Sequence, residues 1–131
     1  MKKDITTRAD IELLVDSFYK LVKKDEVIGY IFNDVVNLSW EKHIPVMYNF
    51  WDTILLGSNT YKGNPMQIHI DLDKKETLKP EHYERWVKLF TETIDSLFEG
   101  DKAEEAKTRA KNMMGLIAFK VEQSRNPKFV Q

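Results

Sequence analysis

The sequence lacks cysteine altogether and has only three histidines among its 131 residues. Without thiols the chain forms no disulfide bond, no thiolate zinc site and no iron–sulfur cluster, and it has no thiol nucleophile. A protein of this kind is compatible with a reducing cytoplasm, and we expect the chain to be cytoplasmic.

Long apolar runs and blocks of one charge are also missing. No stretch approaches the roughly 18 apolar residues of a membrane span, and the N-terminal lysines are not followed by the apolar segment of a secretory signal. The 20 basic and 21 acidic residues are spread along the chain and give a net charge of −1. We therefore expect neither a membrane nor a nucleic acid among the partners.

Catalytic motifs are scarce as well. A di-iron site of the ferritin type needs Glu three residues before His, but Trp40, Met66 and Lys79 stand at those positions. The zinc-protease pattern His-Glu-x-x-His, a glycine-rich phosphate loop and a serine elbow are absent. Side chains alone therefore offer little catalytic equipment, and a bound cofactor would have to supply the chemistry.

What the sequence does contain is helical periodicity. Apolar residues recur at intervals of three and four over residues 10–24, 39–56 and 80–99, and again from Asp101 until the pattern frays near Asn126. No alternating strand pattern of useful length is present. The composition predicts a single all-α domain over residues 1–131, with residues 1–8 and 126–131 as frayed ends.

Two of these segments carry polar side chains beside their apolar stripes. Tyr19 lies at the edge of the first stripe, so its ring can be covered and its hydroxyl then needs a polar partner. His43 stands at the head of the second stripe, followed by Met47 and Phe50. Pro45 removes one backbone donor near the start of that helix and can loosen it.

His69 lies in a stretch, residues 64–72, that has few anchors of its own. Glycines and polar residues flank the stretch, so we expect only one or two helical turns there. A metal bonded to the imidazole would supply the missing anchor. The alternative is a partly buried histidine that helps a loop to pack.

Haem suits these residues better than other cofactors. It requires one proximal imidazole, a flat apolar slot lined with aromatic residues, and polar groups over the open face of the iron. His69 is the candidate ligand, and Tyr19, His43 and Trp86 are the polar side chains available for the other face. The unligated ring nitrogen of His69 should donate to a carbonyl one turn earlier, that of Pro65 or Met66.

The order and spacing of several short motifs resemble the third group of the truncated haemoglobins. The resemblance spans residues 14–90, and the motifs that carry it are Phe18-Tyr19, Ile28-Gly29-Tyr30-Ile31-Phe32-Asn33, His43, Asn49-Phe50-Trp51, Leu55-Leu56-Gly57, Tyr61-x-Gly63-x-Pro65, His69, His82-Tyr83-x-x-Trp86 and Leu89-Phe90.

The resemblance implies a truncated globin fold, in which two pairs of helices form a two-over-two sandwich around haem b. By it, His69 is the proximal iron ligand, Tyr19 and Trp86 are distal hydrogen-bond donors, and His43 is a distal or gating histidine. Whether His43 points into the pocket or out of it stays open, because Pro45 lies beside it. The remaining haem contacts that we expect are Phe32, Met47 and Phe50, with Tyr61 and Lys62 near the propionates.

The expected function is the binding of oxygen or another diatomic ligand. Redox processing of oxygen, nitric oxide or peroxide, of a dioxygenase or peroxidase kind, would need an unidentified reductase. Two alternatives are a haem-free helical interaction module, in which the aromatic residues only fill a core, and a carrier of an apolar ligand.

Overall fold

The computed structural model describes residues 2–125, which form five α-helices and one short π-helix. In chain order these are α1 (Arg8–Lys24), η1 (Ile31–Val35), α2 (Trp40–Leu56), α3 (Pro65–Lys75), α4 (Pro80–Leu97) and α5 (Asp101–Arg125). The observed ends of the four long helices lie within two residues of the ends that the periodicity predicted. No helix in this part of the chain is both long and apolar enough to span a membrane.

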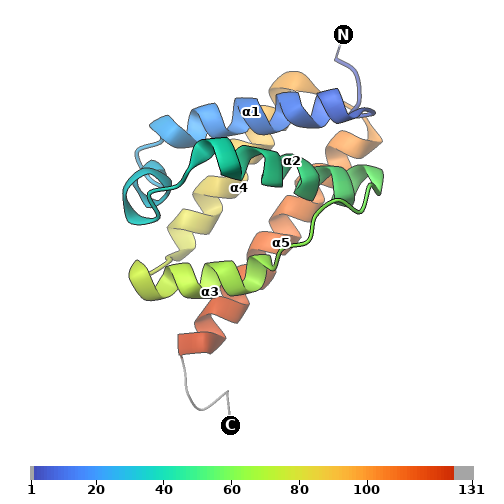
Figure 1. The fold of residues 1–131 in the computed structure, drawn as a ribbon. Coiled ribbons are helices and arrows are strands. Elements are labelled where there is room, and N and C mark those ends of the chain that lie inside the picture. The colour runs from blue at the N-terminus through green and yellow to red at the C-terminus, as the bar shows by residue number, and fades with distance from the viewer. Residues whose placement is uncertain (1, 126–131) are drawn as a thin grey trace.

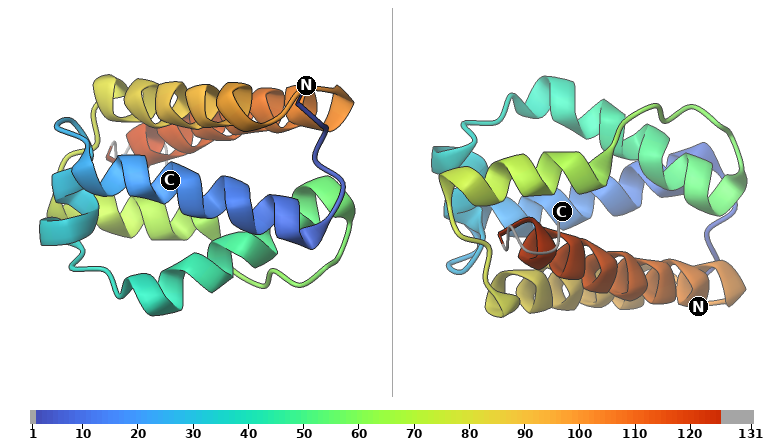
Figure 2. Two further views of the ribbon diagram at one scale, coloured as in Figure 1. Left: turned by 90° about the horizontal axis from the view of Figure 1, so that it is seen from above. Right: turned by 90° about the horizontal axis from the view of Figure 1, so that it is seen from below.

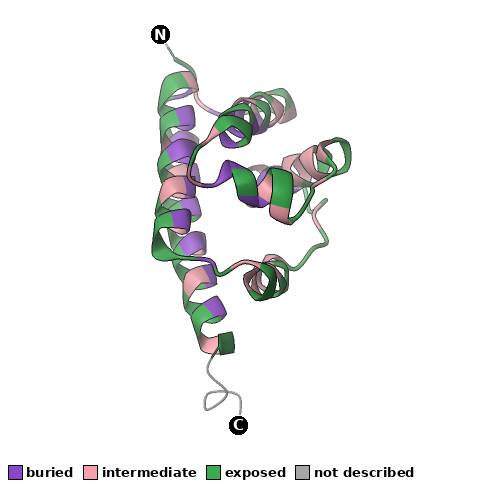
Figure 3. Ribbon diagram, turned by 90° about the vertical axis from the view of Figure 1, so that its left-hand side faces the viewer, coloured by how far each residue is buried: buried purple, intermediate pink, exposed green. Residues whose placement is uncertain are grey.

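The long helices form two layers (Figures 1 and 2). α1 packs on α2, α4 packs on α5, and α1 also crosses α4 and so joins the layers. The shorter α3 packs against α5. Buried residues gather where the layers face each other (Figure 3). The predicted all-α arrangement of two helix pairs is confirmed.

Aromatic rings form the centre of the core. The ring of Phe18 on α1 meets the edges of Trp86 and Phe90 on α4, with centroids 5.0 and 5.1 Å apart. Trp51 on α2 stacks on Phe90 at 4.6 Å. Offset and edge-on contacts between aromatic rings stabilise the folded state by more than the burial of their apolar surface alone. The cluster fixes α1, α2 and α4 relative to one another.

The segment before α1 is ordered, so the expectation that residues 1–8 are frayed is wrong for residues 2–8. Ile5 is fully buried, and the backbone of Lys3 forms an isolated parallel β-bridge with that of Phe98. The carboxylate of Asp4 accepts hydrogen bonds from the amides of Lys102 and Ala103, both at 2.9 Å. The segment is held because it caps α5, a contact between residues almost a hundred positions apart. Residues 126–131, the other predicted frayed end, lie outside the described residues.

The helix that carries His69 is longer than predicted. α3 has 11 residues, begins with Pro65, and is capped by the side chain of Asn64, which accepts from the amide of Gln67 at 3.2 Å. It continues to Lys75, beyond residues 64–72, in which the sequence predicted only one or two helical turns. Contact with α5 supplies the support that α3 lacks in its own sequence, since isolated helices of this length are marginal in water.

The cap on α5 makes a testable prediction. Replacing a capping carboxylate by alanine leaves amide donors without a partner and costs about 0.5–2 kcal/mol. We expect Asp4→Ala to lower the free energy of unfolding, measured in urea at neutral pH, by an amount in this range. Asp101→Ala, at the first residue of the same helix, is the matched control and should cost less. A larger loss at Asp101 would contradict the assignment of the cap.

Candidate functional site

A cavity of about 330 Å³ lies between the helix layers. Its wall is mostly apolar, which is typical of sites that bind small molecules or cofactors. It includes eight of the predicted contact residues, namely Tyr19, Phe32, His43, Met47, Phe50, Tyr61, His69 and Trp86. Lys62 is exposed and is not part of the wall.

His69 is held in one orientation by the backbone of its own helix. Its Nδ1 lies 2.6 Å from the carbonyl oxygen of Pro65, one turn earlier. A carbonyl can only accept, so Nδ1 carries the proton and Nε2 keeps its lone pair. The predicted hydrogen bond one turn back is confirmed. Burial lowers the pKa of His69, and the bond to Pro65 opposes this only in part, so the ring is neutral near pH 7.

Tyr19 and His43 form a polar end of the cavity. Tyr19 is only 4% exposed, and its hydroxyl lies 3.4 Å from Nε2 of His43. Since His43 lines the cavity and faces Tyr19, its side chain points inward in this structure. Burial raises the pKa of Tyr19 and lowers that of His43. Both groups are therefore uncharged at neutral pH, and Tyr19 keeps the proton of its hydroxyl.

The other predicted residues complete the wall. Trp86 is buried and stacks on Phe90, with ring centroids 5.1 Å apart and planes 16° from parallel. Tyr61 meets Phe50 edge-on at 5.0 Å. These contacts fix the aromatic planes, so the shape of the cavity depends on packing rather than on flexible side chains.

Part of the wall was not predicted as such. Met113, Met114 and Ile117 of α5 line the cavity, although the sequence indicated only that they lie on an apolar helical stripe. His82 lines it as well, and its Nδ1 accepts from the amide of Lys79 at 3.0 Å. Periodicity gives the buried face of a helix, whereas membership of a cavity wall depends on which helices pair.

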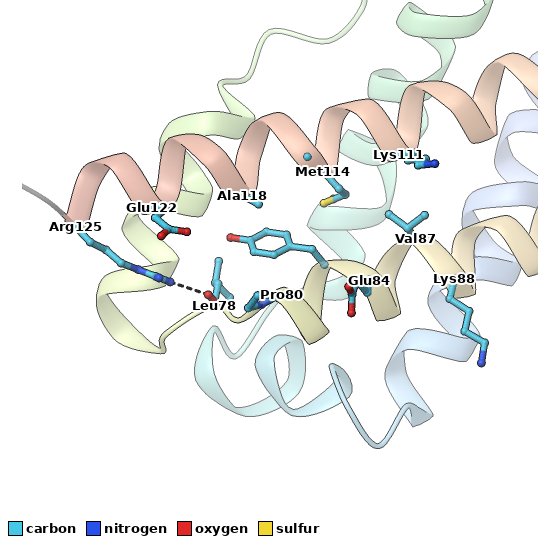
Figure 4. A pocket seen from close by; sticks show the side chains of 12 residues that line it. Leu78, Pro80, Glu84, Val87, Lys88, Lys111, Met114, Ala118, Glu122 and Arg125 are labelled. Atoms are coloured by element: carbon cyan, nitrogen blue, oxygen red, sulfur yellow. Dashed lines mark hydrogen bonds between the residues drawn. The ribbon is translucent and has the colours of Figure 1, made fainter. Parts of the chain in front are cut away.

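The end of α3 is fixed to α5 by a set of charged hydrogen bonds. Arg125 donates to both carboxylate oxygens of Asp73, at 2.9 and 2.6 Å, and to the carbonyl of Leu78 at 2.6 Å. The amide of Leu78 donates to Asp73 at 2.8 Å. Figure 4 shows the bond from Arg125 to Leu78 beside an outer groove between α4 and α5. These bonds hold the helix of His69 against the rest of the fold.

Comparison with known proteins decides the family. The bacterial-like globin family matches residues 3–122. The chain belongs to this family. It is 35% identical over 101 residues to a group 3 truncated haemoglobin of Campylobacter jejuni, an alignment that covers 75% of this chain and 77% of that protein. The crystal structure of a group III truncated haemoglobin from Campylobacter jejuni matches with a TM-score of 0.79 and 30% identity, over 89% of this chain and 92% of that one.

These matches confirm the truncated globin fold and the resemblance to the group III truncated haemoglobins. As a globin, the chain is a haem-binding protein. The residues of the cavity fit that cofactor. One neutral imidazole offers a free Nε2, since no described residue bonds to that atom, and the wall around it is apolar and aromatic. Nowhere in residues 2–125 do three or more His, Asp or Glu side chains gather as a metal site of their own.

The bonds between α3 and α5 make a prediction about pH. The hydrogen bond from Arg125 is the main cause that holds the pKa of Asp73 below its usual value. A carboxyl group whose pKa is lower in the folded state than in the unfolded state stabilises the folded protein. The stabilisation is fully present at pH values above the unfolded pKa of about 3.9, and it disappears as the pH falls through the folded pKa.

We therefore expect Asp73→Asn to lower the free energy of unfolding at pH 7 by about 1 kcal/mol, a modest value because solvent reaches Arg125 and screens the pair. Arg125 is 39% exposed and Asp73 is 7% exposed. The difference from the parent protein should shrink below roughly pH 4. Asp34→Asn, an exposed position on η1, is the control. A difference that stays constant down to pH 2 would refute the role of the charge.

Proposed function

We propose that this globin binds haem b through Nε2 of His69 and takes oxygen or another diatomic ligand at the end of the cavity formed by Tyr19, His43 and Trp86. The 2.6 Å hydrogen bond from His69 to Pro65 carries the proposal, because it leaves Nε2 as the only ring nitrogen able to bind a metal. α3, which bears His69, lies across the molecule from α1, which bears Tyr19 (Figure 1).

When bound, haem supplies an iron atom that takes one imidazole and reversibly takes a diatomic ligand. The chain supplies the surroundings of that ligand. The Tyr19 hydroxyl and the Trp86 indole are donors in a buried, weakly screened site, where hydrogen bonds to partial negative charge are stronger than in water. His69 keeps its orientation and gains basicity by donating from Nδ1 to Pro65.

Tyr61 and Lys62 are the residues that we propose to lie near the haem propionates. Tyr61 belongs to the wall of the cavity, and the exposed Lys62 follows it directly on the surface. An exposed ammonium group stabilises a neighbouring carboxylate weakly, so these residues would orient the cofactor more than they would hold it.

A polar and buried ligand end favours slow release of the ligand. Slow release suits redox processing of oxygen, nitric oxide or peroxide better than bulk transport. Such processing would draw electrons from a reductase in the cytoplasm. Turnover assays with nitric oxide and with peroxide, compared with the rate of oxygen release, separate processing from storage.

The experiment that tests the haem ligand is titration of the purified protein and of His69→Gly with hemin, followed by visible absorption. We expect the parent to reach a sharp Soret band at one equivalent and to shift it with carbon monoxide after reduction. The variant should bind weakly and recover its band on addition of imidazole. Equal titrations of both proteins, with no effect of imidazole, would exclude His69 as the ligand.

The rate of oxygen dissociation tests the two donors. Removal of a buried hydrogen-bond donor costs about 1–3 kcal/mol, so Tyr19→Phe should speed oxygen release by roughly tenfold or more, and Trp86→Phe should act in the same direction. Tyr48→Phe, a matched change on α2 at a side chain outside the cavity wall, is the control. Unchanged rates in Tyr19→Phe and Trp86→Phe would refute both assignments.

A further inference from the structure

The first turn of α2 lacks two of the usual supports of a helix start. Ser39 is at the N-cap position but makes no side-chain hydrogen bond to the helix. Pro45 has no amide hydrogen, so it cannot donate the bond that the carbonyl of Glu41 would otherwise accept. His43 lies in this weakly supported turn. Its inward orientation therefore needs support from side chains.

Trp40 supplies side-chain contacts to His43 in the first turn of α2. Its ring centroid lies 6.0 Å from that of His43 in an edge-on arrangement, and 6.0 Å from that of Phe32 in a stacked one. It lies 5.5 Å from Tyr19. The ammonium group of Lys23 stands 4.7 Å from the centre of the Trp40 ring, within the range of a cation–π interaction. We call Tyr19, Lys23, Phe32, Trp40 and His43 the Trp40 cluster.

Helical spacing explains why these side chains meet. Lys23 follows Tyr19 by four residues on α1, and His43 follows Trp40 by three on α2, so each pair occupies one face of its helix. Where the two helices pack, the faces interlock. Tyr19 then touches both Trp40 and His43, while Lys23 covers the outer side of the Trp40 ring.

We infer that Trp40 is a positioning residue that keeps His43 turned into the cavity, with Lys23 as its outer support. Trp40 is not part of the cavity wall, so it acts on a bound ligand through His43 and Tyr19 and not by contact. The inference rests on the proposed function for its effect on the ligand, since it concerns control of access to that site. The packing of Trp40 on His43 does not depend on the proposed function, because it involves only side chains of this protein.

The alternative position of His43 is in solvent. Glu41, Lys42, Pro45 and Val46, its neighbours on α2, are exposed. A histidine that loses the contact with Trp40 has water within a short rotation of its side chain. An outward His43 leaves Tyr19 without its partner at 3.4 Å and opens the polar end of the cavity.

The test compares the rate of carbon monoxide association in Trp40→Leu and in Trp40→Phe, both loaded with haem. Leucine keeps apolar volume but removes the aromatic contacts, whereas phenylalanine retains a ring. We expect carbon monoxide association to become roughly two- to tenfold faster in Trp40→Leu, the size that one aromatic contact supports. Trp40→Phe should restore most of the parent rate.

A second measurement follows His43 directly by nuclear magnetic resonance. Burial holds the pKa of His43 below its ordinary value, so in Trp40→Leu the pKa should rise toward about 6.5. In a His43→Leu background, Trp40→Leu should no longer change the association rate. An unchanged pKa of His43, or the same acceleration without His43, would overturn the inference.

Lys23→Gln provides an independent arm if Trp40→Leu does not fold. It removes only the cation, and it should speed association by roughly twofold and raise the pKa of His43 slightly. Lys24→Gln, exposed and adjacent on α1, is the control and should have no effect; equal effects at both positions would contradict the role of Lys23. If the protein binds no haem, the proposed function fails, but the pKa of His43 in the haem-free chain still tests the packing.

Discussion

The orientation of His69 depends on one hydrogen bond, from its Nδ1 to the carbonyl of Pro65 in the preceding turn. That bond exists only while α3 is helical, and α3 has no fully buried side chain to hold it by packing alone. Met66 and Ile70 of α3 pack against the core while only partly buried, and polar contacts hold the two ends of the helix. Asn64 caps the start, and Asp73 joins the last turn to Arg125 and Leu78. The free Nε2 of His69 is therefore positioned by the backbone of its own helix and by polar contacts that reach from α3 to α5.

The other end of the cavity follows a different principle. Tyr19, His43 and Trp86 are polar side chains placed by aromatic packing, and burial keeps Tyr19 and His43 uncharged. A neutral hydroxyl and a neutral imidazole can share a hydrogen bond in a weakly screened environment without the cost of burying a charge. The cavity thus combines one free lone pair on α3 with polar side chains on α1, α2 and α4.

Much of this arrangement is readable from the sequence, and the exceptions have a common cause. Periodicity locates the four long helices, and the spacing of His69 after Pro65 predicts the hydrogen bond that fixes its ring. The cap of α5 by Asp4 was missed because it joins residues far apart in the chain, and the ordered residues 2–8 were missed with it. The length of α3 and the role of Trp40 were missed for the same reason. Local patterns contain no information on partners from another helix.

The measurement that tests the account most directly is the iron–histidine stretching band in the resonance Raman spectrum of the reduced, ligand-free protein reconstituted with haem. The account predicts one such band in the parent protein and its loss in His69→Gly, with a band of different frequency after imidazole is added. A band that persists unchanged in His69→Gly would show that another side chain holds the iron and would contradict the assignment of His69.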